Sequence, residues 1–201
     1  MRTRLAKSQR RADILATAKG LFAAHGFTET EMEDIRRACA LSRGGLYHHF
    51  ANKRAVLDAV VAEEVAQLSR LVSTSKGDPL SALLTAGSSH LGAHTGVLAT
   101  LQTHAEKQDY LSALDQAITA DLSPVLAQNL AASVKPGTDP AHVAELFLTI
   151  NAHINRREIL GDWSRATAAA FAATALTALA PLLKNPETLH PIIADLKAQS
   201  T

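Results

Sequence analysis

The chain has 201 residues, enough to bury a core of its own, and its composition is that of a folded protein. A single cysteine, Cys39, excludes an intrachain disulfide and a cysteine-rich zinc site, which fits a reducing, cytoplasmic environment. The net charge is only +1, but residues 1–60 carry +5 and residues 61–201 carry −4, so the N-terminal part is suited to meet a polyanion.

Apolar residues recur at helical spacing along nearly the whole chain, without the sustained alternation typical of strands, which predicts an all-α fold. A first helix has the inner face Ile14, Ala18, Leu21 and Phe22. Gly26 is expected to end this helix in a left-handed conformation, with Phe27 folding back onto its last turn.

Three shorter capped segments follow. Thr30 and Glu33 have the spacing of a capping box, which predicts a second helix with the inner face Met32, Ile35 and Cys39, ending at residues 40–41. Ser42 is placed to cap a third helix that runs through Phe50. Asn52 is placed to cap a fourth helix from Lys53, with its buried side formed by Val56, Leu57, Val60 and Val61.

Residues 42–50, Ser-Arg-Gly-Gly-Leu-Tyr-His-His-Phe, followed by Lys53, resemble the TetR family of bacterial regulators. The resemblance covers about a quarter of the chain. The matching positions are Thr30, Ile35, Ala38, Ser42, Gly44, Leu46, Tyr47, Phe50 and Lys53. It implies an N-terminal three-helix helix-turn-helix domain followed by a helical domain for ligand binding and dimerisation. It also implies a homodimeric repressor that a small molecule releases from operator DNA.

In such a motif the third helix presents its N-terminal residues to the major groove. Leu46 and Phe50 are expected to face inward. The expected DNA-binding residues are Thr30, Ser42, Arg43, Gly44, Gly45, Tyr47, His48 and Lys53. A guanidinium can bond guanine O6 and N7 together, worth about 1–3 kcal/mol of discrimination, so Arg43 is the expected base reader. Phosphate contacts are expected from Tyr47, His48 and Lys53, and from the helix starts near Thr30 and Lys53.

The chain departs from the family at two positions. Ala40 stands where the family usually has glycine, at a cost of about 1 kcal/mol if the turn is left-handed there. Gly45 stands where threonine is common, which removes a hydroxyl that could touch DNA. The N-terminal basic residues Arg2, Arg4, Lys7, Arg10 and Arg11 either offset this loss through phosphate or minor-groove contacts or form a solvated end. The alternative for the whole module is a three-helix core with ordinary surface residues.

The predicted organisation is a DNA-binding domain over residues 1–52, a connecting helix over 53–75 and a regulatory domain over 76–201. Its clearest break is at residues 73–79. Residues 80–105 are apolar and uncharged, which suits helices around a cavity as well as plain core. Pro124 is expected to kink or end a helix, and residues 136–140 to form a loop before a helix that starts at Asp139-Pro140. That helix carries the stripe Val143, Leu146, Phe147, Ile150 and Ile154.

After residues 161–164 a final alanine-rich helix is expected to run to about Leu183. Residues 166–183 approach the length of a membrane span, but alanine, threonine and Pro181 favour a buried soluble helix. The last two helices are expected to pair across a two-fold axis into a four-helix dimer, with small contacts from the alanines and apolar area from Leu176, Leu179 and Leu183. The alternative is an ordinary hairpin within one chain.

Polar groups within the apolar helices are the candidate ligand contacts: His90, His94, Gln102, His104, Tyr110, Asn151 and His153. His90 and His94 have a spacing that can bind a metal, but without a neighbouring carboxylate or cysteine motif they are better explained as structural histidines, and no metal or cofactor is expected. Asn151, Asn155 and Glu158 share one helix face, next to Arg156 and Arg157, and suit an interface network better than an anionic ligand.

No catalytic motif occurs, so an enzyme is not expected. The competing function is a ligand-independent structural or nucleoid-type DNA-binding protein. As a repressor, the dimer is expected to place its two third helices about 34–36 Å apart on a near-palindromic operator. An effector that favours a dimer with its third helices further apart would release the dimer from the operator, and the fourth helix is expected to transmit this movement.

Overall fold

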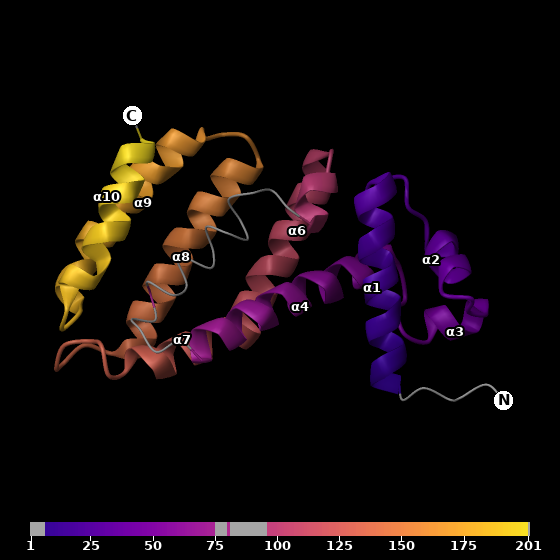
Figure 1. Ribbon diagram of the computed structural model, residues 1–201, viewed down its shortest axis with the longest axis horizontal. Coiled ribbons are helices and arrows are strands. Elements are labelled where there is room, and N and C mark those ends of the chain that lie inside the picture. Colours follow the sequence, from indigo (N-terminus) through magenta and orange to yellow (C-terminus); the bar gives the residue numbers. More distant parts are fainter. Residues whose placement is uncertain (1–6, 75–79, 81–95, 201) are drawn as a thin grey trace. The chain divides into compact units, whose positions relative to one another are not determined.

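The computed structural model describes residues 7–74, 80 and 96–200, and within these ranges the chain folds into helices joined by turns and loops (Figure 1). The all-α prediction is confirmed, since the described residues contain one isolated β-bridge, Val134–Leu183, and no strand. The chain forms two compact units. The first takes the described parts of Met1–Glu63 and His94–Ala113, and the second takes those of Glu64–Ala93 and Leu114–Thr201.

The first unit is built on three helices that cross one another: α1 (Lys7–His25), α2 (Met32–Ala38) and α3 (Arg43–Tyr47). It also holds the start of α4 (Lys53–Thr74), the 3-10 turn η1 (Gly96–Thr100) and the start of α6 (His104–Ala117). Helix α1 packs against both α2 and η1. Leu21 and Cys39, predicted for the inner faces, are only half-buried. The other predicted inner residues are buried: Ile14, Ala18, Phe22, Met32, Ile35, Leu46, Phe50, Val56, Leu57, Val60 and Val61.

The predicted end of α1 is confirmed. Gly26 has a φ of +85°, and its N–H donates to the carbonyl of Phe22 at 2.9 Å. Because Gly26 turns the chain back, the Phe27 ring meets the Phe22 ring edge-on at 5.1 Å between centroids. This contact fixes the exit of the chain toward α2.

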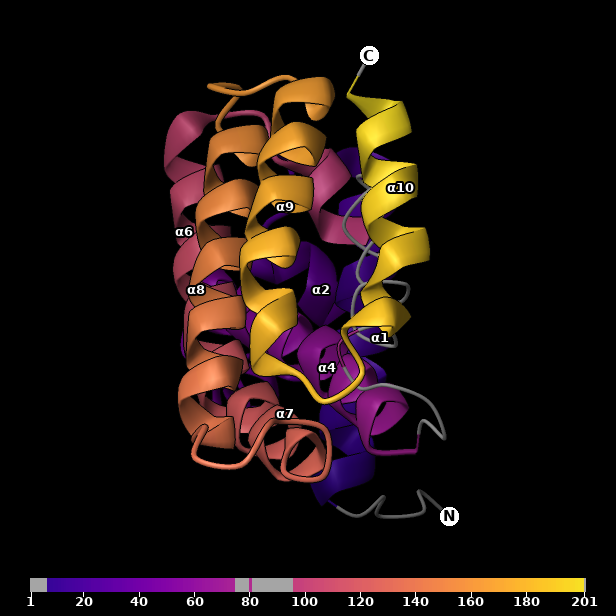
Figure 2. The same ribbon diagram turned by 90° about the vertical axis from the view of Figure 1, so that its left-hand side faces the viewer.

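The second unit contains the ends of α4 and α6 and the later helices. These are the π-helical turn η2 (Ile118–Leu122), α7 (Ser123–Leu130), α8 (Pro140–Ile159), α9 (Arg165–Leu179), the 3-10 turns η3 (Ala180–Leu182) and η4 (Pro186–Leu189), and α10 (His190–Gln199). Helices α8, α9 and α10 lie side by side, and α7 packs against α8 (Figure 2). Asp139 caps α8 by accepting the Ala141 N–H at 2.9 Å, and Ser164 caps α9 by accepting the Thr167 N–H at 3.1 Å.

Several predicted boundaries are wrong. The alanine-rich helix is not the last, because the chain turns at η3 and η4 and returns as α10 along α9. The third helix ends at Tyr47 rather than continuing through Phe50. Within residues 80–105, residues 81–95 lie outside the described residues, and Gly96–Thr100 is a 3-10 turn. The predicted break at 73–79 is described only up to Thr74, where α4 ends.

Helix α9 buries its small and apolar residues inside its own unit. Ala168, Ala169, Ala173, Leu176 and Leu179 are all buried, and Leu183 after it is buried too. These residues pack inside their own unit and are not free for a dimer contact, whereas Ala170 and Ala178 of the same helix are exposed. Arg165–Leu182 is, among the described residues, the one stretch long and apolar enough to cross a bilayer, and 33% of it is buried in the structure.

Candidate DNA-binding interface

Helix α3 has a side-chain cap at its start, one buried face and one exposed face. The Ser42 hydroxyl accepts the N–H of Gly45 at 3.1 Å, which confirms the predicted cap. Leu46 and Phe50 are buried and fasten the helix from below, as predicted. The side chains of Arg43, Tyr47 and His48 are left exposed to solvent.

Arg43 and Tyr47 form a pair on this exposed face. Tyr47 is 43% exposed, and the Arg43 guanidinium carbon lies 5.9 Å from the centre of its ring. A guanidinium that borders an aromatic ring is held without losing its hydrogen-bond donors. The pair therefore offers a planar donor and a phenolic hydroxyl on one side of α3.

The two glycines of α3 have different surroundings. A Cβ at Gly44 would meet nothing within 4 Å. A Cβ at Gly45 would lie 3.1 Å from the Ser42 hydroxyl oxygen, inside the cap. The absence of a side chain at position 45 therefore has a structural reason in the cap, whereas position 44 is open.

The turn between α2 and α3 is left-handed, as expected, and contains alanine. Ala40 has a φ of 51°. The N–H of Ala40 donates to the carbonyl of Arg37 at 3.0 Å, and that of Leu41 donates to the carbonyl of Arg36 at 3.1 Å. These two bonds form a Schellman motif with alanine at the position that glycine usually takes.

Thr30 does not cap α2, so the predicted capping box is wrong. Its side chain is 1% exposed, and its hydroxyl donates to the carbonyl of Gly26 at 2.7 Å. The cap residue is Glu31, whose N–H donates to the Asp34 carboxylate at 2.9 Å. Because the Thr30 hydroxyl is used inside the fold, this residue has only its backbone to offer DNA.

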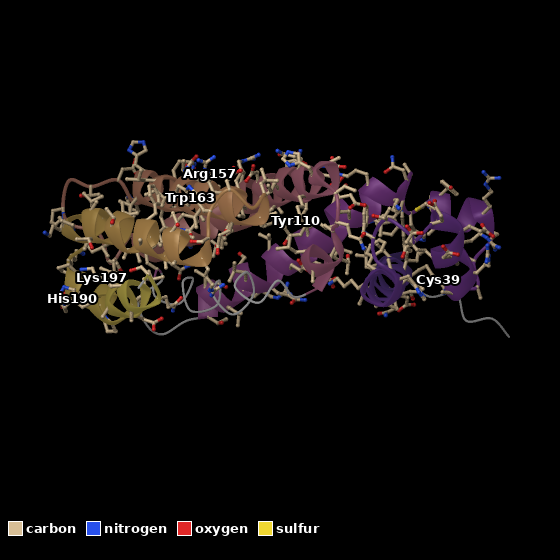
Figure 3. The ribbon with its side chains drawn as sticks, turned by 90° about the horizontal axis from the view of Figure 1, so that it is seen from above. Cys39, Tyr110, Arg157, Trp163, His190 and Lys197 are labelled. Carbon is tan, nitrogen blue, oxygen red and sulfur yellow. The ribbon has the colours of Figure 1, made fainter. Side chains whose placement is uncertain are left out.

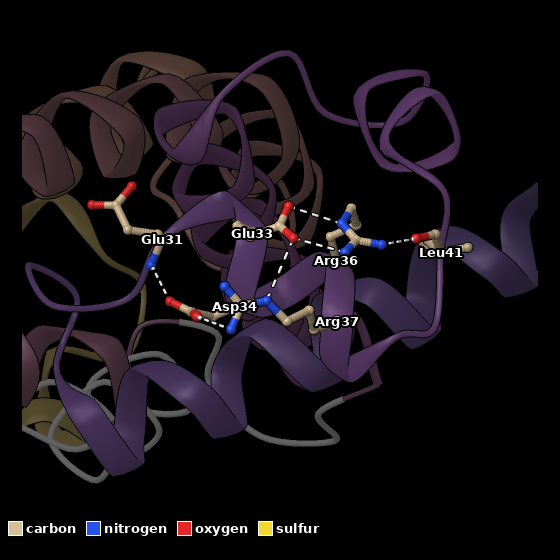
Figure 4. A network of polar contacts seen from close by, with 6 residues as sticks. All are labelled: Glu31, Glu33, Asp34, Arg36, Arg37 and Leu41. Atoms are coloured by element: carbon tan, nitrogen blue, oxygen red, sulfur yellow. Dashed lines mark hydrogen bonds and ion pairs between the residues drawn. The ribbon is translucent and has the colours of Figure 1, made fainter.

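Glu33, the other half of the predicted box, instead joins an ionic network on α2 (Figure 4). Its two oxygens accept hydrogen bonds from Nη2 and Nε of Arg36 at 2.7 and 2.8 Å. The hydrogen bonds from Arg36 lower the pKa of Glu33 from its ordinary 4.5 to about 2. The carboxylate is therefore ionised at any physiological pH.

Lys53 also points into the protein. Its Nζ donates to the carbonyl oxygens of Phe27 and Thr28 at 2.9 and 3.0 Å, and lies 4.7 Å from the centre of the Phe27 ring. Asn52 caps α4 as predicted, by accepting the N–H of Ala55 at 2.8 Å. Lys53 thus fastens the loop between α1 and α2 to the start of α4.

Cations from α1 gather at the far end of α3. Arg11 donates to the carbonyl of His49 at 3.3 Å and stacks on Phe50, with its guanidinium carbon 4.3 Å from the ring centre. Burial lowers the pKa of His49, and so do the nearby charges of His48, Lys7, Arg11 and Arg10. A positive surface therefore borders α3 at this end. Arg2 and Arg4 lie outside the described residues.

The candidate ligand contacts that the structure describes are divided between the two units. In the first unit Gln102 and His104 are exposed and Tyr110 is buried. In the second unit the Asn151 amide donates to the Phe147 carbonyl of its own helix at 2.9 Å. His90 and His94 lie outside the described residues. Within the described ranges no group of three metal-ligating side chains occurs.

His153 belongs to an aromatic cluster at the end where α8 meets α9. Its ring lies 5.2 Å from Trp163 and 5.7 Å from Phe171, and those two rings lie 5.1 Å apart. Arg157 stacks on Trp163 at 5.4 Å and pairs with Asp162 at 3.0 Å (Figure 3). Arg156 pairs with Asp115 at 3.3 Å. The polar face of α8 is thus occupied by contacts within the unit.

The fold and the α3 site together define a helix-turn-helix protein with a second helical unit. Residues 14–60 match the family model described as bacterial regulatory proteins, tetR family. Over this helix-turn-helix segment the chain is therefore similar to the DNA-binding domain of TetR-family proteins.

Curated relatives are similar over the same segment. The regulator UidR of Escherichia coli K12 is 39% identical over 54 residues, 27% of this chain and 28% of the relative. The repressor KstR2 of Rhodococcus jostii RHA1 is 40% identical over 55 residues, 27% of each chain. The repressor AcnR of Corynebacterium diphtheriae is 32% identical over 66 residues, 33% of this chain and 35% of the relative. The matches thus span about a third or less of these relatives.

Solved structures extend the similarity of fold to nearly the whole chain. The Rhodococcus erythropolis repressor QsdR superposes with a TM-score of 0.64 at 18% identity, over 89% of this chain and 96% of its own. A TetR-family regulator of Pectobacterium atrosepticum gives 0.55 at 23% identity, over 90% and 98%. Thermus thermophilus FadR, solved with lauroyl-CoA, gives 0.59 at 18% identity, over 84% and 92%.

Proposed function

We propose that this protein is a sequence-specific transcriptional regulator that represses its target genes and leaves its operator when a small-molecule effector binds. The observation that carries the proposal is the exposed Arg43–Tyr47 pair on a capped helix whose opposite side is buried. A side chain with five fixed donors suits guanine, and the neighbouring phenol suits a phosphate. Such a regulator works in the cytoplasm.

We propose that residues 1–52 bind DNA, that residues 53–75 connect the two parts, and that residues 76–201 bind the effector and form the dimer. Helix α4 links the two units, since Lys53–Thr74 starts in the first and ends in the second. Helix α6 is a second link, because His104–Ala117 is divided in the same way.

The start of α6 is bound to the reading part of the first unit. Thr28 donates to Glu106, and Arg54 of α4 pairs with Asp109. Glu106 also accepts the N–H groups of Gln102 and Thr103 at 3.0 Å each. Although burial raises it, hydrogen bonds from Thr28, Thr103 and Gln102 bring the pKa of Glu106 below its ordinary value. An effector that moves α4 or α6 would therefore shift α3 with it.

A homodimer through α8 and α9 is supported by exposed apolar side chains on these adjacent helices. Leu146 on α8 is 46% exposed and Phe171 on α9 is 41% exposed. Leu146, Ile150 and His153 recur at the spacing of one helix face, and Phe171 contacts His153. Two copies of this surface would form a two-fold four-helix contact. This surface lies on the two long helices that the sequence suggested, with Leu146 and Phe171 in place of the buried leucines.

The effector's identity is left to experiment. FadR, which shares the fold, was solved with lauroyl-CoA, and this supports a small-molecule effector here. The competing function is a ligand-independent, nucleoid-type DNA-binding protein. It needs no operator and no response to any ligand.

The test is binding of purified protein to the DNA that flanks its own gene, measured by fluorescence anisotropy at several salt concentrations. Arg43→Ala should weaken operator binding by about 10- to 100-fold and reduce the ratio of the affinity for the operator to the affinity for random DNA. Lys197→Ala, which removes an exposed cation of α10, is the matched control and should bind as the wild type does. Equal binding of all DNA sequences by the wild type would favour the nucleoid-type function instead.

A further inference from the structure

Arg36, in the last turn of α2, contacts the turn that leads into α3. Its Nη1 donates to the carbonyl of Leu41 at 2.6 Å, and its Nε and Nη2 bind the Glu33 carboxylate as a fork (Figure 4). The side chain is only 28% exposed. All three guanidinium nitrogens are therefore engaged in contacts within the first unit, and the Glu33 carboxylate neutralises their charge.

Leu41 is held from both sides by this one residue. The Leu41 N–H donates to the backbone carbonyl of Arg36 at 3.1 Å, while the Leu41 carbonyl accepts from the Arg36 side chain. The next residue is Ser42, the cap of α3. The orientation of Leu41 therefore decides where the cap sits and in which direction α3 starts.

Helix α3 cannot fix its own direction. It has five residues, two of which are glycine, and glycine has low helix propensity. In addition, the turn is strained, because alanine at a φ of 51° costs about 1–2 kcal/mol. The hydrogen bonds of Arg36, together with the bond from the Ala40 N–H to the Arg37 carbonyl, hold this strained turn.

We propose that Arg36 is a positioning residue for DNA recognition, which acts through the Leu41 carbonyl on the direction of α3 and makes no phosphate contact of its own. The inference rests on the proposed function, since it concerns how α3 meets an operator. From the charge pattern alone, Arg36 would be counted among the basic N-terminal residues that bind phosphate. The inference gives it a structural role instead.

Arg36→Lys separates the two roles, because lysine keeps the charge but cannot bind a carboxylate as a fork and a carbonyl at the same time. If Arg36 positions α3, this change should lower operator affinity by about tenfold and leave binding to random DNA unchanged. A phosphate contact would survive the change. Arg37→Lys is the matched control, since Arg37 is 66% exposed and reaches only Glu33 and Asp34.

A second variant tests the route through the turn. Ala40→Gly removes the left-handed strain, so the turn should hold without Arg36, and Arg36→Lys combined with Ala40→Gly should recover most of the lost affinity. If Arg36→Lys alone is too unstable to assay, the double variant can still be measured, because the turn of the double variant is expected to fold.

The outcomes are distinct. Wild-type operator affinity in Arg36→Lys, or no recovery in the double variant, would overturn the inference and leave the proposed function intact. A wild-type protein without preference for the operator would overturn the proposed function, and the inference would fall with it. Circular dichroism of each variant would confirm that the helices are formed.

Discussion

The ammonium nitrogen of Lys53 lies 2.9 Å from the carbonyl oxygen of Phe27 and 4.7 Å from the centre of the Phe27 ring. A lysine at the start of a helix next to a DNA-reading element is expected to bind phosphate, but here its donors are directed at two backbone carbonyls. It therefore closes the loop between α1 and α2 rather than extending toward solvent.

Lys53→Met should lower the free energy of unfolding by about 1 kcal/mol, because two charge-assisted hydrogen bonds at a half-buried site are lost. Urea unfolding followed by circular dichroism measures this. Lys107→Met, on α6, serves as the control. The slope of log K against log salt for DNA should stay unchanged, whereas a slope smaller by about 1 would mean that Lys53 contacts a phosphate.

Ala40→Gly should stabilise the protein by about 0.5–1 kcal/mol. The left-handed strain at position 40 is larger than the extra chain entropy that glycine gives the unfolded state. Ala38→Gly, two residues earlier at the last residue of α2, should destabilise by up to about 1 kcal/mol, since there glycine relieves no strain and has low helix propensity. The two midpoints in urea should therefore move in opposite directions. A shift of both to lower urea would contradict the strain at Ala40.

Glu33→Gln should change how stability depends on pH. The pKa of Glu33 is about 2 in the folded protein and 4.5 ordinarily, so the ionised carboxylate contributes fully above pH 4.5 and loses its contribution as the pH falls toward 2. The difference in unfolding free energy between wild type and variant should therefore shrink across this window. Urea titrations in steps of pH measure it. A difference that stays constant would mean that the network with Arg36 is absent in solution.

Phe171→Glu should convert a dimer into a monomer, because a carboxylate on the exposed side of α9 would be buried without a partner when two copies meet. Sedimentation velocity gives the oligomeric state. Lys197→Glu, at an exposed position of α10 and with a larger change of charge, should remain dimeric. A dimer that tolerates the Phe171 change would exclude the α8–α9 surface as the contact.

The features predictable from the sequence are the local ones. Ser42, Asn52 and Asp139 cap their helices as predicted, because a short polar side chain before an apolar repeat has few other roles. Gly26 and Ala40 take the left-handed conformations that their turns require. Buried positions such as Leu46 and Phe50 follow from helical spacing.

The features that the sequence could not provide depend on which partner a polar group finds in three dimensions. Thr30 has the spacing of a cap, but burial brings its hydroxyl to the Gly26 carbonyl instead. Arg36 and Arg37 are adjacent and look alike, yet only Arg36 reaches the turn at Leu41. Leu146 belongs to an apolar stripe, but spacing does not say whether one chain or a second copy covers it.

The contact between position 45 and the Ser42 hydroxyl limits how the specificity of α3 can be redesigned. Any side chain at position 45 would press on the cap at 3.1 Å, whereas position 44 is open to substitution. A combinatorial library meant to retarget this protein to a new operator should therefore randomise residues 43, 44 and 47 and keep residue 45 as glycine. A side chain at position 45 would require the Ser42 hydroxyl to shift by a few tenths of an ångström, so a library at that position would alter the cap together with the DNA contact.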